Sequence, residues 1–371
     1  MYILIIFCVI LCIMTEINDI RLEGEFKNVT FSNYKKKNVN TELLNNIFKS
    51  KIEESCYWSA ELICSGHFLD LWNIIIKSYC TYIHLGNPKL IIFIKRKLEY
   101  FVNYVKMYQE NIIKLRNNDS IRKMFCEIIS ILCYSVKKPS INVPKIEVND
   151  MNITNITEKF IAPNTDFVNK YIEDDDPNEL FIPLNELVYN LKNNNIMNSF
   201  YWIKWVLCYH SICKKNKKKL LCSTRYPTKI DSSFQKHVIW LIWKILLDVI
   251  KEKNCKVLEQ ISSCALYLFQ VKFTEGVCNQ RIGLLYYMIQ IICEENPQIT
   301  KPILNATELE KIKVITNKID NIYTQLKKNE IAPKTNYLFI NENTNLDKSK
   351  LKIDAINSFE NLKNKLKIKN D

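Results

Sequence analysis

The side chains best suited to chemistry are a group of cysteines and one histidine between residues 208 and 222. Cys208, His210, Cys213 and Cys222 are residue types that hold zinc in structural sites. Their spacing matches no standard zinc finger, and on a helix the first two would point about 200° apart. The four side chains could surround a metal only if that helix were unwound, so buried thiols are the favoured interpretation.

A second candidate is the run of four carboxylates at residues 173–176, directly ahead of Pro177. Carboxylate oxygens are the ligands that divalent cations such as calcium and magnesium prefer. Acidic residues before a proline are also typical of a helix start, where they complement the positive end of the helix dipole. We expect this second role.

Glycine is scarce, and its scarcity excludes several catalytic signatures. The chain has 5 glycines in 371 residues, where average usage would give about 26. It contains no GxGxxG turn, no Gly-Lys-Ser/Thr phosphate loop and no Gly-x-Ser-x-Gly nucleophile elbow. We therefore predict no catalytic residue and no cofactor. The sequence favours a non-enzymatic protein, and an enzyme of unrecognised type stays open as an alternative.

The strongest basic run covers residues 214–219 and is followed by a single arginine. Its members are Lys214, Lys215, Lys217, Lys218, Lys219 and Arg225. If all of them contacted a phosphate backbone, DNA binding would show a log–log salt slope of about −4 to −5 with little sequence preference. The alternative is a solvated helix end, where the dipole favours cations. The net charge of +13 is weak support, because AT-rich codon usage also produces lysine.

The elements that must position these groups are predicted to be helices. Apolar residues recur with the helical period in nearly every long segment, and hairpin turns have almost no glycine available. We predict an all-α fold. The expected helices cover residues 41–66, 68–85, 89–116, 119–136, 178–193, 197–215, 231–252, 254–272, 276–295 and 306–328.

The helices are expected to form two modules, either helical bundles or α-solenoid-like stacks. The first covers residues 41–136 and the second residues 165–328. Residues 137–164 break the helical pattern with three prolines and are predicted to connect the modules. A polar, lysine-rich tail follows at residues 329–371.

A short repeat suggests that the two modules are related. Tyr57-Trp58, followed after four residues by Ile63-Cys64, recurs as Tyr201-Trp202 followed by Leu207-Cys208. Aromatic residues are abundant in this chain, so chance is the alternative explanation. If the repeat is real, it predicts two helical modules that bury similar aromatic faces.

The first 14 residues are an unbroken apolar run that leaves the compartment open. The run is too short for a spanning helix but suits a signal-peptide core or a membrane anchor. No basic residue precedes it, and Met14 could be the true start. The cysteines lie in apolar helical runs, which indicates free thiols in a reducing compartment. We favour the host cytoplasm or a viral factory, with the membrane or secretory pathway as the alternative.

The segment from Glu53 to Leu90, EESCYWSAELICSGHFLDLWNIIIKSYCTYIHLGNPKL, resembles proteins encoded by giant nucleocytoplasmic DNA viruses. It is also faintly similar to the helical collar of clamp-loader subunits. The positions that carry this second likeness are Tyr57, Trp58, Gly66, Gly86 and Pro88. The resemblance implies at most a detached collar-like helical module, because the chain has no phosphate loop.

Taken with the composition, the resemblance favours a non-enzymatic binding or assembly protein of a large DNA virus, acting in genome replication or packaging. Its protein partners are not identified by the sequence. DNA is an expected partner through the basic run, and a membrane only if residues 1–14 are retained. The rival class is a membrane-associated or secreted structural protein.

Overall fold

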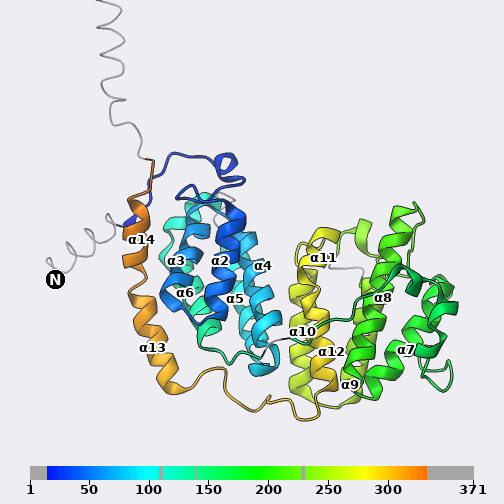
Figure 1. Cartoon of the computed structure of the whole chain (residues 1–371). Helices are drawn as coiled ribbons and strands as arrows, with labels where there is room; N and C mark the ends of the chain where they lie inside the picture. The colour runs from blue at the N-terminus through cyan, green and yellow to red at the C-terminus, as the bar shows by residue number, and fades with distance from the viewer. Residues whose placement is uncertain (1–14, 108–111, 139, 227–229, 332–371) are drawn as a thin grey trace, which may run out of the picture.

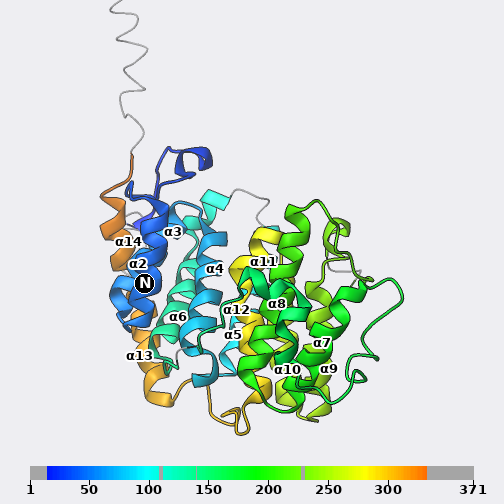
Figure 2. The same cartoon turned by 45° about the vertical axis from the view of Figure 1, so that its right-hand side comes forward.

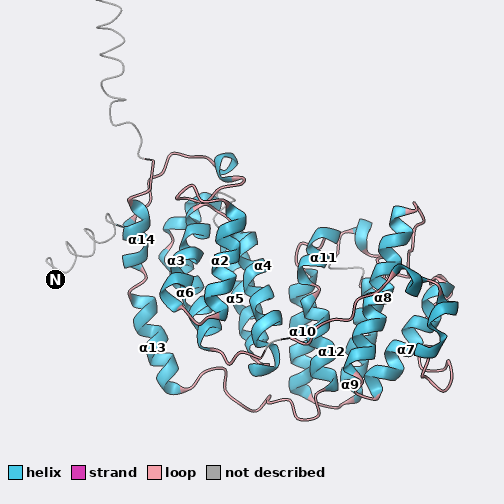
Figure 3. Ribbon diagram, in the orientation of Figure 1, coloured by secondary structure: helices cyan, strands magenta, loops and turns pink. Residues whose placement is uncertain are grey.

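The computed structural model describes residues 15–107, 112–138, 140–226 and 230–331. Within these residues every regular element is a helix, and the only β pairing consists of isolated bridges (Figure 3). The predicted all-α fold is therefore confirmed. The apolar run 1–14 and most of the lysine-rich tail lie outside the described residues.

The helices fall into two groups that lie side by side (Figures 1 and 2). The first group comprises α2 (Lys36–Phe48), α3 (Ile52–Cys64), α4 (Phe68–Ser78), α5 (Leu90–Met107) and α6 (Asp119–Tyr134). The second group comprises α7 (Phe181–Lys192), α8 (Ile196–Lys215), α9 (Ile239–Glu252), α10 (Lys256–Gln270), α11 (Glu275–Arg281) and α12 (Gly283–Cys293). Two further helices follow, α13 (Ala306–Asn317) and α14 (Asp320–Lys327).

Three of the predicted helices are each divided in two. The single helix expected over residues 41–66 is a hairpin of α2 and α3, whose turn places Ser50 in the left-handed region with φ 58°. The segments 276–295 and 306–328 likewise form α11–α12 and α13–α14. The break at Ser50 was missed because no glycine or proline marks that turn and the apolar period continues across it.

The two copies of the short repeat fold alike. Asn194, in the α7–α8 turn, has φ 54° and stands at the same offset from Ser50 as Tyr201 from Tyr57. In each hairpin the residue after the turn donates its backbone N–H five residues back, over 2.9 Å in the first copy and 2.8 Å in the second. Ser55 and Ser199 then each donate their hydroxyl to the carbonyl four residues earlier. The same left-handed residue and five-residue hydrogen bond also end α8 at Lys217 and Lys218, so this turn geometry does not decide between duplication and chance.

The predicted extent of the second module is wrong at its C-terminal end. Helices α13 and α14 do not stay with α7–α12; they pack on α6 and α3 of the first group (Figure 1). The chain thus crosses between the groups twice, once through residues 137–164 and once after α12. Sequence periodicity cannot reveal this return, because it identifies an apolar helix face without identifying the surface it covers.

A polar junction fixes the seam between the two groups. The carbonyl of Pro88 accepts hydrogen bonds from the hydroxyls of Tyr79, 3.1 Å away, and Tyr287, 3.2 Å away. The two tyrosine rings meet edge to face at 5.2 Å. Helix α12 comes so close to the π-helical turn after α4 that a Cβ on Gly283 would lie 2.9 Å from the Cβ of Cys80. Buried residues of both groups belong to one hydrophobic core.

We predict that Gly283→Ala destabilises the protein. The added methyl group would meet the Cβ of Cys80 at 2.9 Å, and overpacking of this kind costs about 1–3 kcal/mol. Gly24→Ala is the matched control, because nothing lies within 4 Å of its Cβ position. Thermal unfolding should show a lower midpoint for the first variant only. Equal midpoints would contradict the close approach at the seam.

Candidate functional site: the seam groove

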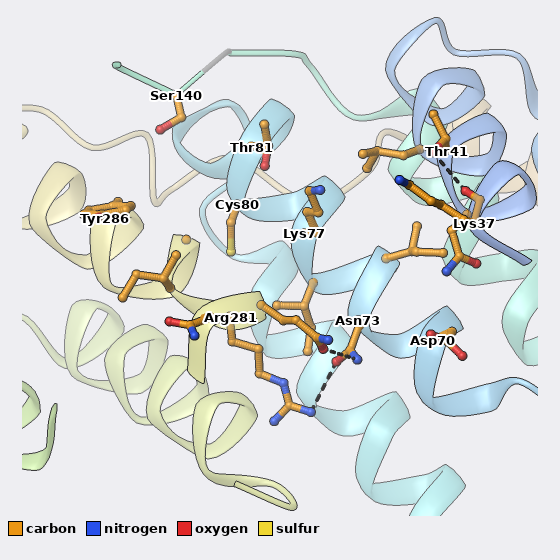
Figure 4. A pocket seen from close by; sticks show the side chains of 18 of the residues that line it. Lys37, Thr41, Asp70, Asn73, Lys77, Cys80, Thr81, Ser140, Arg281 and Tyr286 are labelled. Carbon is orange, nitrogen blue, oxygen red and sulfur yellow. Dashed lines mark hydrogen bonds between the residues drawn. The ribbon is translucent and has the colours of Figure 1, made fainter. Parts of the chain in front are cut away.

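Two adjoining cavities open along the seam, and together we call them the seam groove. The first, of about 680 Å³, lies between α2, α4 and the π-helical turn on one side and α11–α12 on the other (Figure 4). The second, of about 600 Å³, lies between α8, α12 and the connection at residues 143–145. Asn279, Ile282 and Tyr286 line both cavities, so the two cavities adjoin at these residues.

The lining of the seam groove is strongly basic. Its lysines are Lys36, Lys37 and Lys77 in the first cavity and Lys145 and Lys204 in the second. Among the described lining residues the one carboxylate is Asp70, which lies 3.1 Å from the ammonium group of Lys36. The other four lysines form no ion pair with any described residue. The groove therefore presents a positive potential to solvent.

A buried arginine adds to this potential from beneath the first cavity. Arg281 is only 3% exposed, and its guanidinium donates to the carbonyls of Leu268 and Val271 at the end of α10. No described carboxylate pairs with it, and its Nε atom has no hydrogen-bond partner. Burial lowers the pKa of Arg281 to about 10, so the side chain stays charged at neutral pH. The carbonyl end of α10 offsets part of the cost of burying this charge.

Carboxamide side chains supply the other polar groups of the first cavity. Asn73 on α4 donates to Gln280 on α11 over 2.8 Å, a hydrogen bond that spans the seam (Figure 4). Asn40 on α2 also lines this cavity, and its carbonyl oxygen has no hydrogen-bond partner. Such amides can both donate and accept, which suits them to a ligand that carries N–H and C=O groups.

The predicted basic run is only partly available for binding. Lys214 pairs with Glu275, and Lys218 pairs with Glu179 at 2.5 Å. Its other lysines, Lys215, Lys217 and Lys219, are exposed and pair with no described residue. Lys215 stands one turn beyond Ser211, which lines the second cavity, and so continues the groove-facing stripe of α8.

The expectation that Arg225 contacts phosphate is wrong, because its side chain is only 4% exposed and pairs with Asp176. Burial alone would raise the pKa of Asp176, but hydrogen bonds from Arg225 and from the backbone of Glu173 and Ser223 hold it below its usual value. The acidic run is therefore tied into the fold. Among the described residues no three Asp, Glu, His or Cys side chains converge to hold a metal.

The predicted zinc ligands do not come together. Helix α8 runs unbroken through Cys208, His210 and Cys213, so these side chains point in different directions. The ring of His210 instead lies against that of His237, with the centroids 4.3 Å apart. Cys213 and Cys222 are buried. The interpretation as buried free thiols agrees with the structure, and the zinc hypothesis does not.

The residues of the collar-like motif have structural roles in this fold. Tyr57 and Trp58 pack edge to face, and Tyr34 packs in turn on Trp58. Gly66 ends α3 with φ 77°, and a Cβ on Gly86 would lie 2.3 Å from the carbonyl oxygen of Val136. Pro88 supplies the carbonyl of the seam junction. These contacts explain the residue types without assigning the motif a function.

Of the predicted site residues, Cys208 lines the second cavity, and sequence reasoning missed the lysines and amides of the groove. The lining residues come from α2, α4, the connection, α8, α11 and α12, which are far apart in the chain. Lysines with amides on a helix surface look like any solvated face. The pairing of Lys214 and Lys218 with carboxylates is equally invisible without the tertiary fold.

Comparisons with protein-family models, with curated proteins and with solved structures find no match to this chain. Within the described residues no helix combines the length and the apolar composition needed to cross a membrane.

We predict that acidification destabilises the protein through His237. Burial, with repulsion from His210, lowers its pKa to about 4, although Glu275 nearby opposes the shift. Between pH about 6.5 and 4 the unfolded chain binds a proton that the native state does not, so stability is full above this window and falls as pH decreases. The loss by pH 4 should be about 3 kcal/mol. Chemical denaturation from pH 7 to 4 should show a shallower decline for His237→Gln; an unchanged decline would contradict this origin.

If the exposed lysines at the end of α8 bind duplex DNA, three contacts should give a log–log salt slope of about −3 rather than −4 to −5. Binding to random duplex across a salt series measures the slope. Changing Lys215, Lys217 and Lys219 to Gln should flatten it, whereas changing the paired Lys214 and Lys218 should have a smaller effect. If changing Lys214 and Lys218 flattens the salt slope as much per lysine as changing the other three, the ion pairs of Lys214 and Lys218 open on binding.

Proposed function

We propose that this chain is a non-enzymatic binding or assembly protein whose seam groove holds an anionic partner. The observation that carries the proposal is the basic lining between the two helix groups, in which five lysines stand against one carboxylate. Beneath it lies Arg281, whose guanidinium is held by backbone carbonyls and forms no ion pair with a described carboxylate. An anion in the groove would receive favourable interactions from both sides of the seam.

The chemistry of the lining supports binding rather than catalysis. Cys80 is the thiol on the wall of the first cavity, and burial raises its pKa far above the ordinary value. It therefore stays protonated at neutral pH, which makes it a poor nucleophile. The lysines and amides of the lining can hold a partner by charge and hydrogen bonds without any covalent step.

The setting that we propose is the cytoplasm of a cell infected by a large DNA virus, in genome replication or packaging. Support comes from the likeness of residues 53–90 to proteins of giant viruses and from the AT-rich residue usage. Assembly proteins of such a process need anion-binding surfaces, because their partners are nucleic acids or acidic proteins.

We predict that reversing two lysine charges in the groove weakens binding of inorganic polyphosphate. The variant Lys37→Glu/Lys77→Glu places two negative charges in the first cavity, and each reversal should cost about 1 kcal/mol. Affinity measured by calorimetry at low salt should fall about thirtyfold. The matched control is Lys311→Glu/Lys318→Glu, on α13 and directly after it, which makes the same change of net charge outside the lining. Equal losses in both variants would mean that polyphosphate senses only net charge, and the proposed site would fall.

A further inference from the structure

The geometry of the seam groove points to an extended acidic polypeptide segment, with acidic and apolar residues alternating, as its partner. This inference rests on the proposed function and identifies the class of anion. Three features carry it: the two adjoining cavities, the exposed carboxamide of Asn279 that lines both, and the combination of apolar lining residues with exposed lysines.

An extended chain fits the form of the groove and its amides. Successive residues of a strand present N–H and C=O groups to the sides and alternate their side chains between two faces. Asn279 is exposed and lines both cavities. Its amide can accept from and donate to the backbone of a bound segment.

The alternation follows from the arrangement of apolar and charged groups. Ile74 and Ile282 belong to the lining, whereas Lys37 and Lys77 are exposed. A segment that alternates would turn its apolar side chains to the isoleucines and its carboxylates to the lysines. The two cavities, of about 680 and 600 Å³, each have the size of a ligand site. An extended segment that passes Asn279, Ile282 and Tyr286 would contact both cavities.

Other occupants fit the groove less well. Single-stranded nucleic acid is usually held by exposed aromatic side chains that stack on bases, but Tyr286 in the lining is only 9% exposed. Arg281, which could grip a phosphate with two N–H groups, is directed to carbonyls of its own chain. The chain's own residues 332–371 contain more lysine than aspartate and glutamate, so their charge is the same as that of the groove.

The test uses the full chain and a fluorescein-labelled decapeptide of alternating Glu and Leu. Fluorescence anisotropy should show saturable binding that unlabelled peptide displaces, and the decapeptide of alternating Lys and Leu should not bind. Asn279→Ala should weaken binding of the Glu-Leu peptide about fivefold, the loss of one neutral hydrogen bond. The same variant should lose less affinity for inorganic polyphosphate, because polyphosphate has no N–H groups to donate to the amide oxygen.

Each outcome separates this inference from the proposed function. If polyphosphate binds in the groove but the Glu-Leu peptide does not, the acidic-segment inference is overturned and the anion site stands. If neither binds, both fail. If single-stranded DNA binds more strongly than the peptide and depends equally on Lys37 and Lys77, the partner is nucleic acid and the acidic-segment inference is overturned. Asn279→Ala should keep the thermal midpoint of the wild type, because this side chain is exposed.

Discussion

The arrangement of the whole molecule depends on one buried carbonyl with two donors. Tyr79 comes from the first helix group and Tyr287 from the second, and both hydroxyls reach the carbonyl oxygen of Pro88. A buried carbonyl or hydroxyl left without a partner costs about 1–3 kcal/mol, so separating the groups would expose or orphan all three. The junction forms only because Gly283 has no side chain at the point where α12 meets the π-helical turn. This close approach sets the width of the seam and therefore the walls of the groove.

The seam combines a specific polar junction with charges that it does not neutralise. Arg281 satisfies the C-terminal carbonyls of α10, which ties α11 to the second helix group, and its weak 3.4 Å hydrogen bond to Asn73 reaches across to α4. A cation in this position is costly to bury, and a carboxylate beside it would remove most of that cost. None is present among the described residues. The hydrogen bonds of Arg281 that join the helix groups thus also hold a positive charge beneath the groove. The packing of the seam and its electrostatic potential therefore depend on the same side chain.

The sequence predicted the fold class and several helices well, because apolar periodicity and caps are local signals. Helix α8 was expected at residues 197–215 and lies at 196–215, with Asn195 capping it through its side chain. The turn at Ser50 had no such signal, since a serine in the left-handed region resembles any other serine. The return of α13 and α14 to the first group and the pairing of Arg225 with Asp176 depend on contacts between distant segments. The groove could not be predicted for the same reason.

The two similar hairpins, α2–α3 and α7–α8, allow the groove wall to be compared with a buried helix face. At the offset that relates Tyr57 to Tyr201, Lys36 corresponds to Leu180 and Asn40 to Leu184. Both leucines are fully buried in the second copy. In the first copy the same positions carry a charge and an amide and line the first cavity. Two hairpins of the same geometry therefore use one face in opposite ways: the second copy buries it in the core, and the first keeps it polar and open. Lys36 and Asn40 thus keep open, as the wall of the first cavity, a face that the second hairpin covers completely.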